Sequence, residues 1–262
     1  MSSSLQQRKL NKEAIDGYLF ISPWLVGFLI FTLGPLIASI LLSFTKWDIF
    51  SAPEFVGIAN YTKLFADPLF KKSLYNTFYY AVFSIPLGMA GGLFLAVLLN
   101  QKVKGLPIFR TLFYLPSVTS GVAVALLWKW IFNPEFGIAN LILNMCGLPS
   151  LQWLSSPHWA MPALIIMSLW GVGGGMLIYL AGLQGIPQQL YEAAELDGAG
   201  WWSCFVKITL PMLSPTLFFQ LIMGIIGSFQ VFTQVYVMTQ GGPANATLVY
   251  VLYLYQNAFQ WW

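Results

Sequence analysis

The chain has 262 residues, of which 58% are hydrophobic and only 8% are charged, and its formal net charge is +3. Soluble domains carry about 25% charged residues, so this composition excludes a water-exposed globular protein and indicates an integral membrane protein. The few basic residues are dispersed along the chain, and we therefore expect no nucleic-acid partner.

The chain begins with a positively charged tail, residues 1–17, which leads into a long apolar run. This run is much longer than the apolar core of a secretory signal peptide, and no small-residue cleavage site closes it. We therefore interpret it as a retained anchor and as the first membrane span. The sequence predicts five spans, at about residues 18–45, 75–100, 108–132, 160–184 and 212–238.

Helices are the expected form of these spans, because a helix satisfies its own backbone hydrogen bonds inside the bilayer. The predicted fold class is therefore an all-α integral membrane protein. Basic residues gather in the N-terminal tail and near residues 101–110, and they favour a cytoplasmic N-terminus. These residues are Arg8, Lys9, Lys12, Lys102, Lys104 and Arg110. The alternation of spans then places residues 185–211 in the cytoplasm and residues 46–74 and 133–159 outside, although the first outer segment also carries lysines.

The cytoplasmic segment contains YEAAELDGAG, residues 191–200, which holds three of the nine acidic residues of the chain. Pro187 can occupy the first position of a helix, and Gly198 fits the left-handed residue that ends one. Trp201, Phe205 and Ile208 form an apolar stripe in a second short helix. The segment is therefore predicted to be a helix–turn–helix. It is either a polar connector or a docking element for a soluble partner.

The fifth span combines uncharged polar groups with aromatic rings, which suit a neutral ligand inside the bilayer. The residues are Gln220, Ser228, Phe229, Gln230, Phe232, Gln234 and Tyr236. Gln230 and Gln234 are four residues apart and would share one face of a helix. Polar residues in spans also join helices together, so both interpretations stay open. Weaker candidates, Ser117, Thr119 and Ser120, follow Pro116 in the third span.

Glycine pairs in the second and fourth spans have the spacing of close helix packing. They are Gly88 with Gly92 and Gly171 with Gly175. The only histidine, His158, is interpreted as an interfacial polar residue. The chain has no phosphate-binding loop of the G-x-x-x-x-G-K-[ST] type, no metal-ligand cluster and no catalytic constellation. An intramembrane enzyme is therefore disfavoured, and no catalytic residue or metal site is predicted.

The run E-A-A-x-x-D-G-A, followed by Phe205 and by I-x-L-P-x-x-x-P, resembles the EAA signature of permease subunits of binding-protein-dependent ABC importers. GSFQVFTQVYVMTQGGPANATLVYVLYLYQNAF resembles the carbohydrate-uptake group of these permeases, as do the early runs ISPWLVGFLIFTLGPLIASILLSFTKWD and FVGIANYTKLFADPLFKKSLYNTF. The resemblance covers most of the chain. It implies a type I ABC importer permease fold, with residues 18–262 as the permease domain and a coupling loop at about 185–211. Because the family typically has six spans, it also implies that the chain is incomplete at its C-terminus.

The resemblance implies partners and residue roles as well. Glu192 would pair with a basic residue of an ATPase subunit, while the alanines allow close contact and Asp197 and Gly198 shape the turn. The implied ATPase-coupling residues are Glu192, Ala193, Ala194, Asp197, Gly198, Leu210 and Pro211. The implied substrate-binding residues are Phe229, Gln230, Phe232, Gln234 and Tyr236.

The implied assembly contains two ATPase subunits, a second permease and an extracytoplasmic substrate-binding protein in a bacterial inner membrane. ATP and Mg²⁺ would bind the ATPase subunits, and this chain would bind no cofactor. The expected function is import of a sugar, polyol or glycerol phosphate by alternating access. The alternative function is a membrane scaffold that holds a soluble partner without transporting anything.

Overall fold

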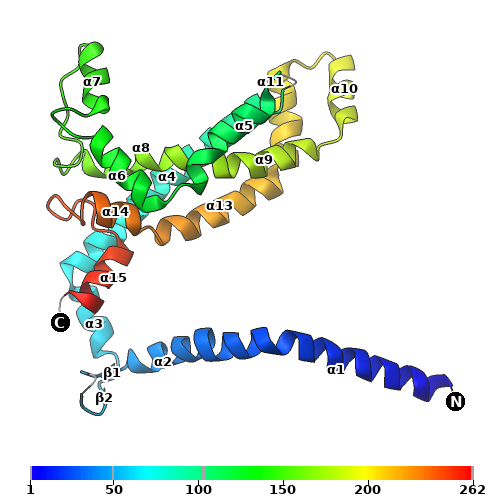
Figure 1. Cartoon of the computed structure of the whole chain (residues 1–262), viewed down its shortest axis with the longest axis vertical. Coiled ribbons are helices and arrows are strands. Elements are labelled where there is room, and N and C mark those ends of the chain that lie inside the picture. Colours follow the sequence, from blue (N-terminus) through cyan, green and yellow to red (C-terminus); the bar gives the residue numbers. More distant parts are fainter. Residues whose placement is uncertain (1, 49, 102–103, 261–262) are drawn as a thin grey trace. The chain divides into compact units, whose positions relative to one another are not determined.

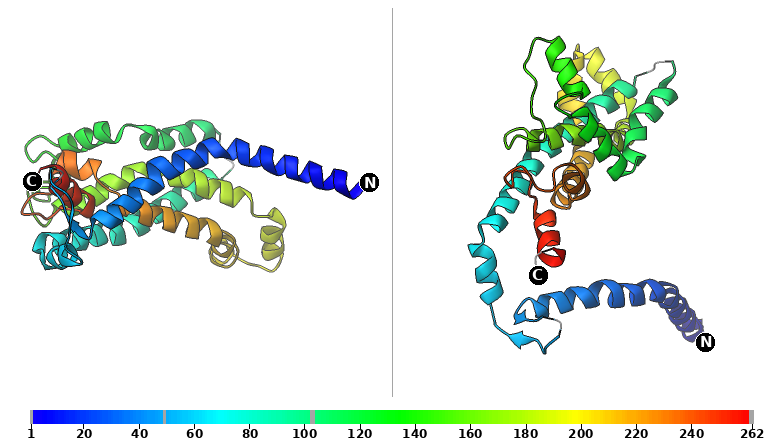
Figure 2. Two further views of the ribbon diagram at one scale, coloured as in Figure 1. Left: turned by 90° about the horizontal axis from the view of Figure 1, so that it is seen from below. Right: turned by 60° about the vertical axis from the view of Figure 1, so that its left-hand side comes forward.

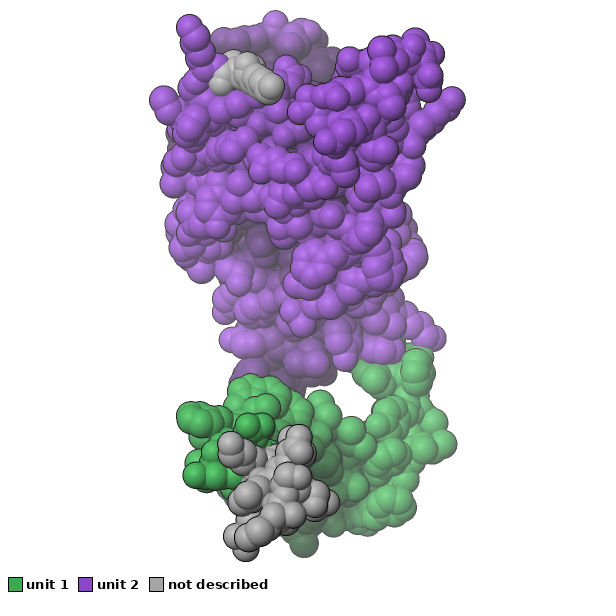
Figure 3. All heavy atoms as spheres, turned by 90° about the vertical axis from the view of Figure 1, so that its right-hand side faces the viewer, with its two compact units in different colours: residues 1–67 green, residues 68–262 purple. Residues whose placement is uncertain are grey.

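The structure, a computed structural model, describes residues 2–48, 50–101 and 104–260. Lys102, which the sequence assigns to a cytoplasmic loop, lies outside the described residues. The chain divides into two compact units, Met1–Asp67 and Pro68–Trp262 (Figure 3). The boundary predicted at residue 17 falls within a helix, α1 (Ser2–Phe28), which runs from the tail into the first span.

The first unit is built around a long apolar helix. α1 continues through a π-helical turn, Leu29–Leu33, into α2 (Gly34–Leu42) (Figure 1). The π-turn ends two residues before Pro35, whose ring would clash with the carbonyl of residue 31 in a regular α-helix. Lys12–Leu42 is long and apolar enough to cross a membrane, and its most apolar part is not buried within the structure.

A short hairpin closes the first unit. Strands β1 (Thr45–Lys46) and β2 (Glu54–Phe55) pair antiparallel and lead to α3 (Ala59–Ala66). The Asn60 side-chain amide donates hydrogen bonds to the carbonyl oxygens of Ser43 and Thr45, at 2.9 and 2.8 Å. These bonds fix the turn after the first span.

The second unit is organised along one long helix, α4 (Pro68–Leu99). α9 (Gly173–Gln184) and α13 (Ser214–Phe229) pack against it (Figures 1 and 2). Glycine permits this packing at Gly92, because a Cβ atom there would lie 3.3 Å from the Tyr179 ring and 3.4 Å from the Val172 carbonyl oxygen. The predicted close packing of the glycine pairs is therefore confirmed at Gly92.

The remaining spans are bent helix pairs. The third joins α5 (Leu106–Tyr114) and a 3₁₀ turn (Leu115–Val118) to α6 (Gly121–Ile131), with a bend of 97°. The fourth joins α8 (Ala160–Ser168) and a 3₁₀ turn (Leu169–Gly171) to α9, with a bend of 47°. The fifth joins α11 (Trp201–Cys204), a π-turn (Phe205–Thr209) and α12 (Leu210–Met212) to α13, with a bend of 65°.

Within the described residues, up to five spans result if each bent pair is counted as one, which is the number that the sequence predicts. The fifth differs from its predicted extent of 212–238, because α13 ends at Phe229 and a separate helix, α14 (Thr233–Met238), follows. Its direction also changes at residue 213, two residues before Pro215. Proline and glycine residues lie near these bends. Proline removes a helical hydrogen bond and glycine lacks a side chain that restricts the backbone, and both are usual causes of a kink.

The two ends of the second unit have different structures. One end carries α7 (Ile138–Met145), α14 and the last helix, α15 (Tyr250–Phe259), whereas α10 (Gln188–Leu196) lies at the other end (Figures 1 and 2). Buried Asn76 of α4 donates to the carbonyl oxygens of Asn245 and Leu248, both at 2.9 Å. This amide anchors the loop between α14 and α15.

Candidate functional site

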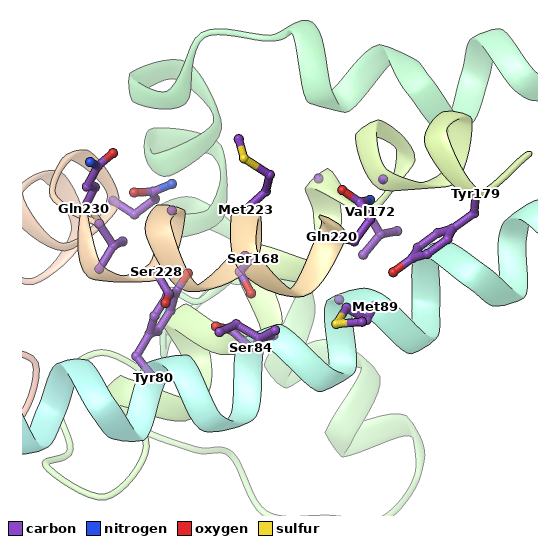
Figure 4. Close-up of a pocket in the computed structure, with 18 residues that line it drawn as sticks. Tyr80, Ser84, Met89, Ser168, Val172, Tyr179, Gln220, Met223, Ser228 and Gln230 are labelled. Carbon is purple, nitrogen blue, oxygen red and sulfur yellow. The ribbon is translucent and has the colours of Figure 1, made fainter. Parts of the chain in front are cut away.

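A cavity of about 460 Å³ lies among α4, the junction of α8 with α9, and α13. This volume is within the range of about 300–1,000 Å³ typical of small-molecule pockets. Side chains from all three elements surround the cavity (Figure 4). Its polar lining residues are Tyr80, Ser84, Ser168, Tyr179, Gln220, Ser228, Gln230 and Gln234.

The lining carries hydroxyl and amide groups, and none of its residues is Asp, Glu, Lys, Arg or His. A charged ligand inside a bilayer requires a counter-ion, because an unpaired charge is costly away from water. A neutral ligand with hydroxyl groups needs only hydrogen-bond donors and acceptors. The cavity is therefore suited to an uncharged, polar molecule.

The cavity brings together part of the set that the sequence singles out. Gln230 and Gln234 line it, whereas Phe229, Phe232 and Tyr236 are not among its lining residues. The argument that Gln230 and Gln234 share one face of a continuous helix is wrong, because α13 ends before Gln230 and α14 starts at residue 233. Both amides still reach the cavity, from either side of this break.

The aromatic candidates have a different environment. Phe232 stacks on Tyr236 with ring centroids 5.3 Å apart, and Tyr255 of α15 packs against both rings, at 5.1 and 5.5 Å. Phe229 is exposed on α13. The rings of Phe232 and Tyr236 therefore join α14 to α15 and do not line the cavity. Ser117, Thr119 and Ser120 also lie outside the lining.

Sequence reasoning missed the cavity residues of α4, α8 and α9. Tyr80 and Ser84 are one helical turn apart on α4, while Ser168 and Tyr179 come from the two halves of the fourth span. The signal in the sequence that could have indicated them is the presence of hydroxyl side chains within apolar spans. Which of them converge depends on how the helices pack. Gly88, Gly171 and Gly175 also border the cavity, so part of the predicted packing set forms its wall instead.

Residues 186–213, which contain YEAAELDGAG, are called the acidic segment. This segment has the predicted helix and turn. α10 ends in a left-handed glycine, Gly198, with φ of +76°. The amide of Ala199 donates to the Ala194 carbonyl oxygen at 2.9 Å, and the Gly198 amide donates to the Glu195 carbonyl oxygen at 3.0 Å. These two bonds define a Schellman motif. The predicted role of Gly198 as a helix end is confirmed, while Pro187 precedes the helix instead of starting it.

The surface of this segment is both acidic and apolar. Glu192, Ala193 and Asp197 are exposed and Ala194 is half-buried. Leu196 is 91% exposed, and Trp201 and Trp202 are about two-thirds exposed. Such clusters of large apolar side chains mark interaction sites on proteins. The predicted second helix is interrupted, because a π-turn begins at Phe205. The ring of Phe205 stacks on that of Trp201, with ring centroids 5.5 Å apart.

The base of the segment is packed into the second unit. Ile186 and Leu213, the residues at its two ends, are buried in one cluster with residues of α4 and α9, and Tyr191 and Ile208 pack against that cluster. The Tyr191 hydroxyl also hydrogen-bonds the Thr209 hydroxyl at 2.9 Å, which joins α10 to the π-turn. Leu210 is half-buried and Pro211 exposed in α12. The segment is therefore fixed to the spans at both of its ends.

Comparison with known proteins identifies the class. Residues 88–262 match the family model of binding-protein-dependent transport system inner membrane components. The chain is 44% identical over 261 residues to the probable ABC transporter permease protein YesP of Bacillus subtilis strain 168, covering 98% of this chain and 84% of YesP. The chain therefore belongs to the family of binding-protein-dependent transport system inner membrane components.

Two further comparisons agree with this assignment. The lactose transport system permease protein LacF of Rhizobium radiobacter is 37% identical over 254 residues, covering 94% of this chain and 84% of LacF. A crystal structure of a bacterial alginate ABC transporter, in complex with an alginate pentasaccharide-bound periplasmic protein, contains a similar chain. That similarity has a TM-score of 0.83 at 27% identity and covers 96% of this chain and 86% of the other. The fold is that of a type I ABC importer permease.

Proposed function

We propose that the chain transports a neutral sugar through the cavity among α4, α9 and α13, as the permease subunit of an ATP-driven importer. The observation that carries this proposal is an uncharged, hydroxyl- and amide-lined cavity in a protein of this transport family. The names of the relatives support the ligand class, because LacF belongs to a lactose transport system. Polyols are compatible with the same lining, since they offer the same groups.

The acidic segment supplies the connection to an energy source. The sequence has no phosphate-binding loop of its own, so ATP and Mg²⁺ are assigned to partner ATPase subunits. Exposed Glu192 is available to a basic residue of such a subunit, beside exposed apolar groups at Leu196 and Trp201. Because Ile186 and Leu213 anchor the segment in the span core, movement of the segment would be transmitted to the spans.

The orientation follows from the same assignment. Binding to cytoplasmic ATPase subunits requires α10 on the cytoplasmic side, together with the N-terminus. α7, α14 and α15, at the other end of the second unit, would then face the binding protein that delivers the sugar. A second permease subunit would complete the translocation path, which reorients by alternating access.

The proposal is tested in proteoliposomes that contain the chain with its ATPase, second permease and binding protein. Uptake of a panel of neutral sugars (lactose, maltose, trehalose and arabinotriose) and ATP hydrolysis are measured together. Gln230→Ala with Gln234→Ala is expected to raise the KM of uptake while leaving basal ATP hydrolysis intact. Absence of uptake for every sugar by the unaltered complex would overturn the proposal and favour the scaffold alternative.

Coupling is tested separately with Glu192→Lys, which replaces the exposed acid by a base. It is expected to abolish stimulation of ATP hydrolysis by the sugar-loaded binding protein, because like charges would then face each other at the contact. The control is Glu13→Lys, an exposed acid of α1 outside the acidic segment. Normal stimulation in the Glu192→Lys complex would show that this carboxylate does not dock the ATPase.

A further inference from the structure

We propose that Tyr179 binds the transported ligand, through a hydrogen bond between its hydroxyl and a hydroxyl group of that ligand. This inference rests on the proposed function of the cavity. It adds a contact at the end of the cavity nearer the acidic segment, from a residue that the sequence patterns do not single out. The ligand class is the same: a neutral molecule with several hydroxyl groups.

The first observation is a buried hydroxyl group with nothing to bind. The Tyr179 side chain has no exposed surface, and among the described residues its hydroxyl oxygen has no hydrogen-bond partner. Buried polar groups are nearly always paired, because leaving one unpaired costs the free energy of removing it from water. Phenylalanine would fill the same space without that cost. A tyrosine here therefore requires a partner that comes from outside the described residues.

The second observation is where this hydroxyl lies. Tyr179 projects from α9 into the cavity, toward α4 and Met89, while Tyr80 and Gln230 occupy the opposite end (Figure 4). Gln220 of α13 lies at the Tyr179 end, and its amide nitrogen would be 2.7 Å from a Cβ atom on Gly175. The unpaired hydroxyl and a side-chain amide thus border the same end of the cavity, and together they offer a donor and an acceptor to a ligand hydroxyl.

The third observation is that the ring cannot turn away. It packs against Gly92 of α4, where an added Cβ atom would lie 3.3 Å from a ring carbon. Met176 and Leu180 are buried in the same cluster. Fixing the ring in advance removes the entropy cost of ordering it when the ligand binds. The hydroxyl is therefore already in place for the ligand.

The same packing connects the ligand to the acidic segment. Tyr179 is in one buried cluster with Leu183, Ile186 and Leu213, and the last two of these anchor the ends of the segment. A ligand bound to the Tyr179 hydroxyl would therefore contact a side chain of the same buried cluster that holds these two anchors. Tyr179 is thus placed to make the position of the acidic segment depend on whether the cavity is occupied.

The test is Tyr179→Phe in the complete reconstituted importer, with uptake measured for the same panel of neutral sugars. The expected result is a KM raised about tenfold, the size typical of one lost hydrogen bond. The midpoint of thermal unfolding in detergent should stay the same or rise, because the unpaired hydroxyl is gone. Tyr75→Phe, an exposed tyrosine of α4 outside the cavity, is the control.

Each outcome decides the inference. An unchanged KM overturns it, and so does a lowered unfolding midpoint or failed assembly, which would show that the hydroxyl has a structural partner. If the double Gln230→Ala, Gln234→Ala variant raises the KM and Tyr179→Phe does not, only this inference fails. If neither variant changes the KM, the cavity itself is not the transport site.

Discussion

Single glycine residues decide how closely the helices of this protein approach each other. At Gly173 an added Cβ atom would overlap the carbonyl group of Phe113, so α9 begins in contact with the backbone of α5. Backbone cannot move aside as the end of a flexible side chain can. At neighbouring Gly171, by contrast, nothing lies within 4 Å of an added Cβ atom. The same sequence run, WGVGGG, thus contains glycines with different physical roles.

Gly173→Ala is expected to destabilise the protein by about 3 kcal/mol or more, since overpacking against backbone must displace a helix. Gly171→Ala is the matched control and should change the free energy of unfolding by less than about 1 kcal/mol. Chemical unfolding in detergent measures both variants. Equal stability of the two would contradict the backbone contact between α9 and α5.

Gly198 has a conformational role instead of a packing role. Nothing lies within 4 Å of an added Cβ atom, but its φ of +76° is strained for any residue with a side chain. Gly198→Val should cost about 1–2 kcal/mol locally and fray the end of α10. Faster hydrogen exchange at the amide of Ala199 would report this. Gly200→Val, at a φ of −76°, is the control and should leave that exchange rate unchanged.

At the level of helices, bends determine the architecture. A continuous fifth span would carry residues 214–238 past the cavity on one helix. Instead α13 stops at Phe229, and α14 starts after a break that leaves Gln230 and Gln234 on the cavity wall. The bend before α13 has a comparable effect at the other end. It places fully buried Leu213 in the core at the point where the acidic segment joins the spans.

Leu213→Ala is therefore expected to lower the free energy of unfolding by about 2–5 kcal/mol, as a large-to-small change in a core does. It should also weaken the coupling between sugar binding and ATP hydrolysis, because the anchor of the segment is loosened. Met212→Ala, the exposed neighbour, should do neither. A similar loss of stability in the two variants would show that Leu213 does not anchor the segment.

At the scale of the whole importer, the proposed transport path requires a cavity that excludes charge. Gln234→Lys would place an ammonium group among hydroxyl and amide side chains, where it has no counter-ion in the lining. We expect uptake of neutral sugars to fall more than about tenfold. An unpaired charge is costly away from water, so the ammonium group would draw in water or a counter-ion, or distort the cavity wall. Gln152→Lys, exposed on the outer segment before α8, should leave uptake unchanged. Full uptake by Gln234→Lys would contradict passage of the sugar along this wall.

The sequence by itself determined the class of protein and the number of spans. Those features depend on composition, on the length of apolar runs and on local rules, and the end of α10 at Gly198 follows from the same local rules. The acidic segment was recognisable because its pattern of Glu, Ala, Asp and Gly is contiguous in the chain.

Only the tertiary structure decided which polar side chains share a cavity. Tyr80 is far in the sequence from Ser168 and Tyr179, and the three converge because α4 packs against α8 and α9. Helical periodicity placed Gln230 and Gln234 on one helix face, but it could not show that the helix breaks between them. It also could not separate Phe232 and Tyr236, which pack against α15, from the residues that line the cavity. The physical reason is that burial and convergence depend on contacts between distant segments, whereas sequence patterns report only on neighbours along one helix.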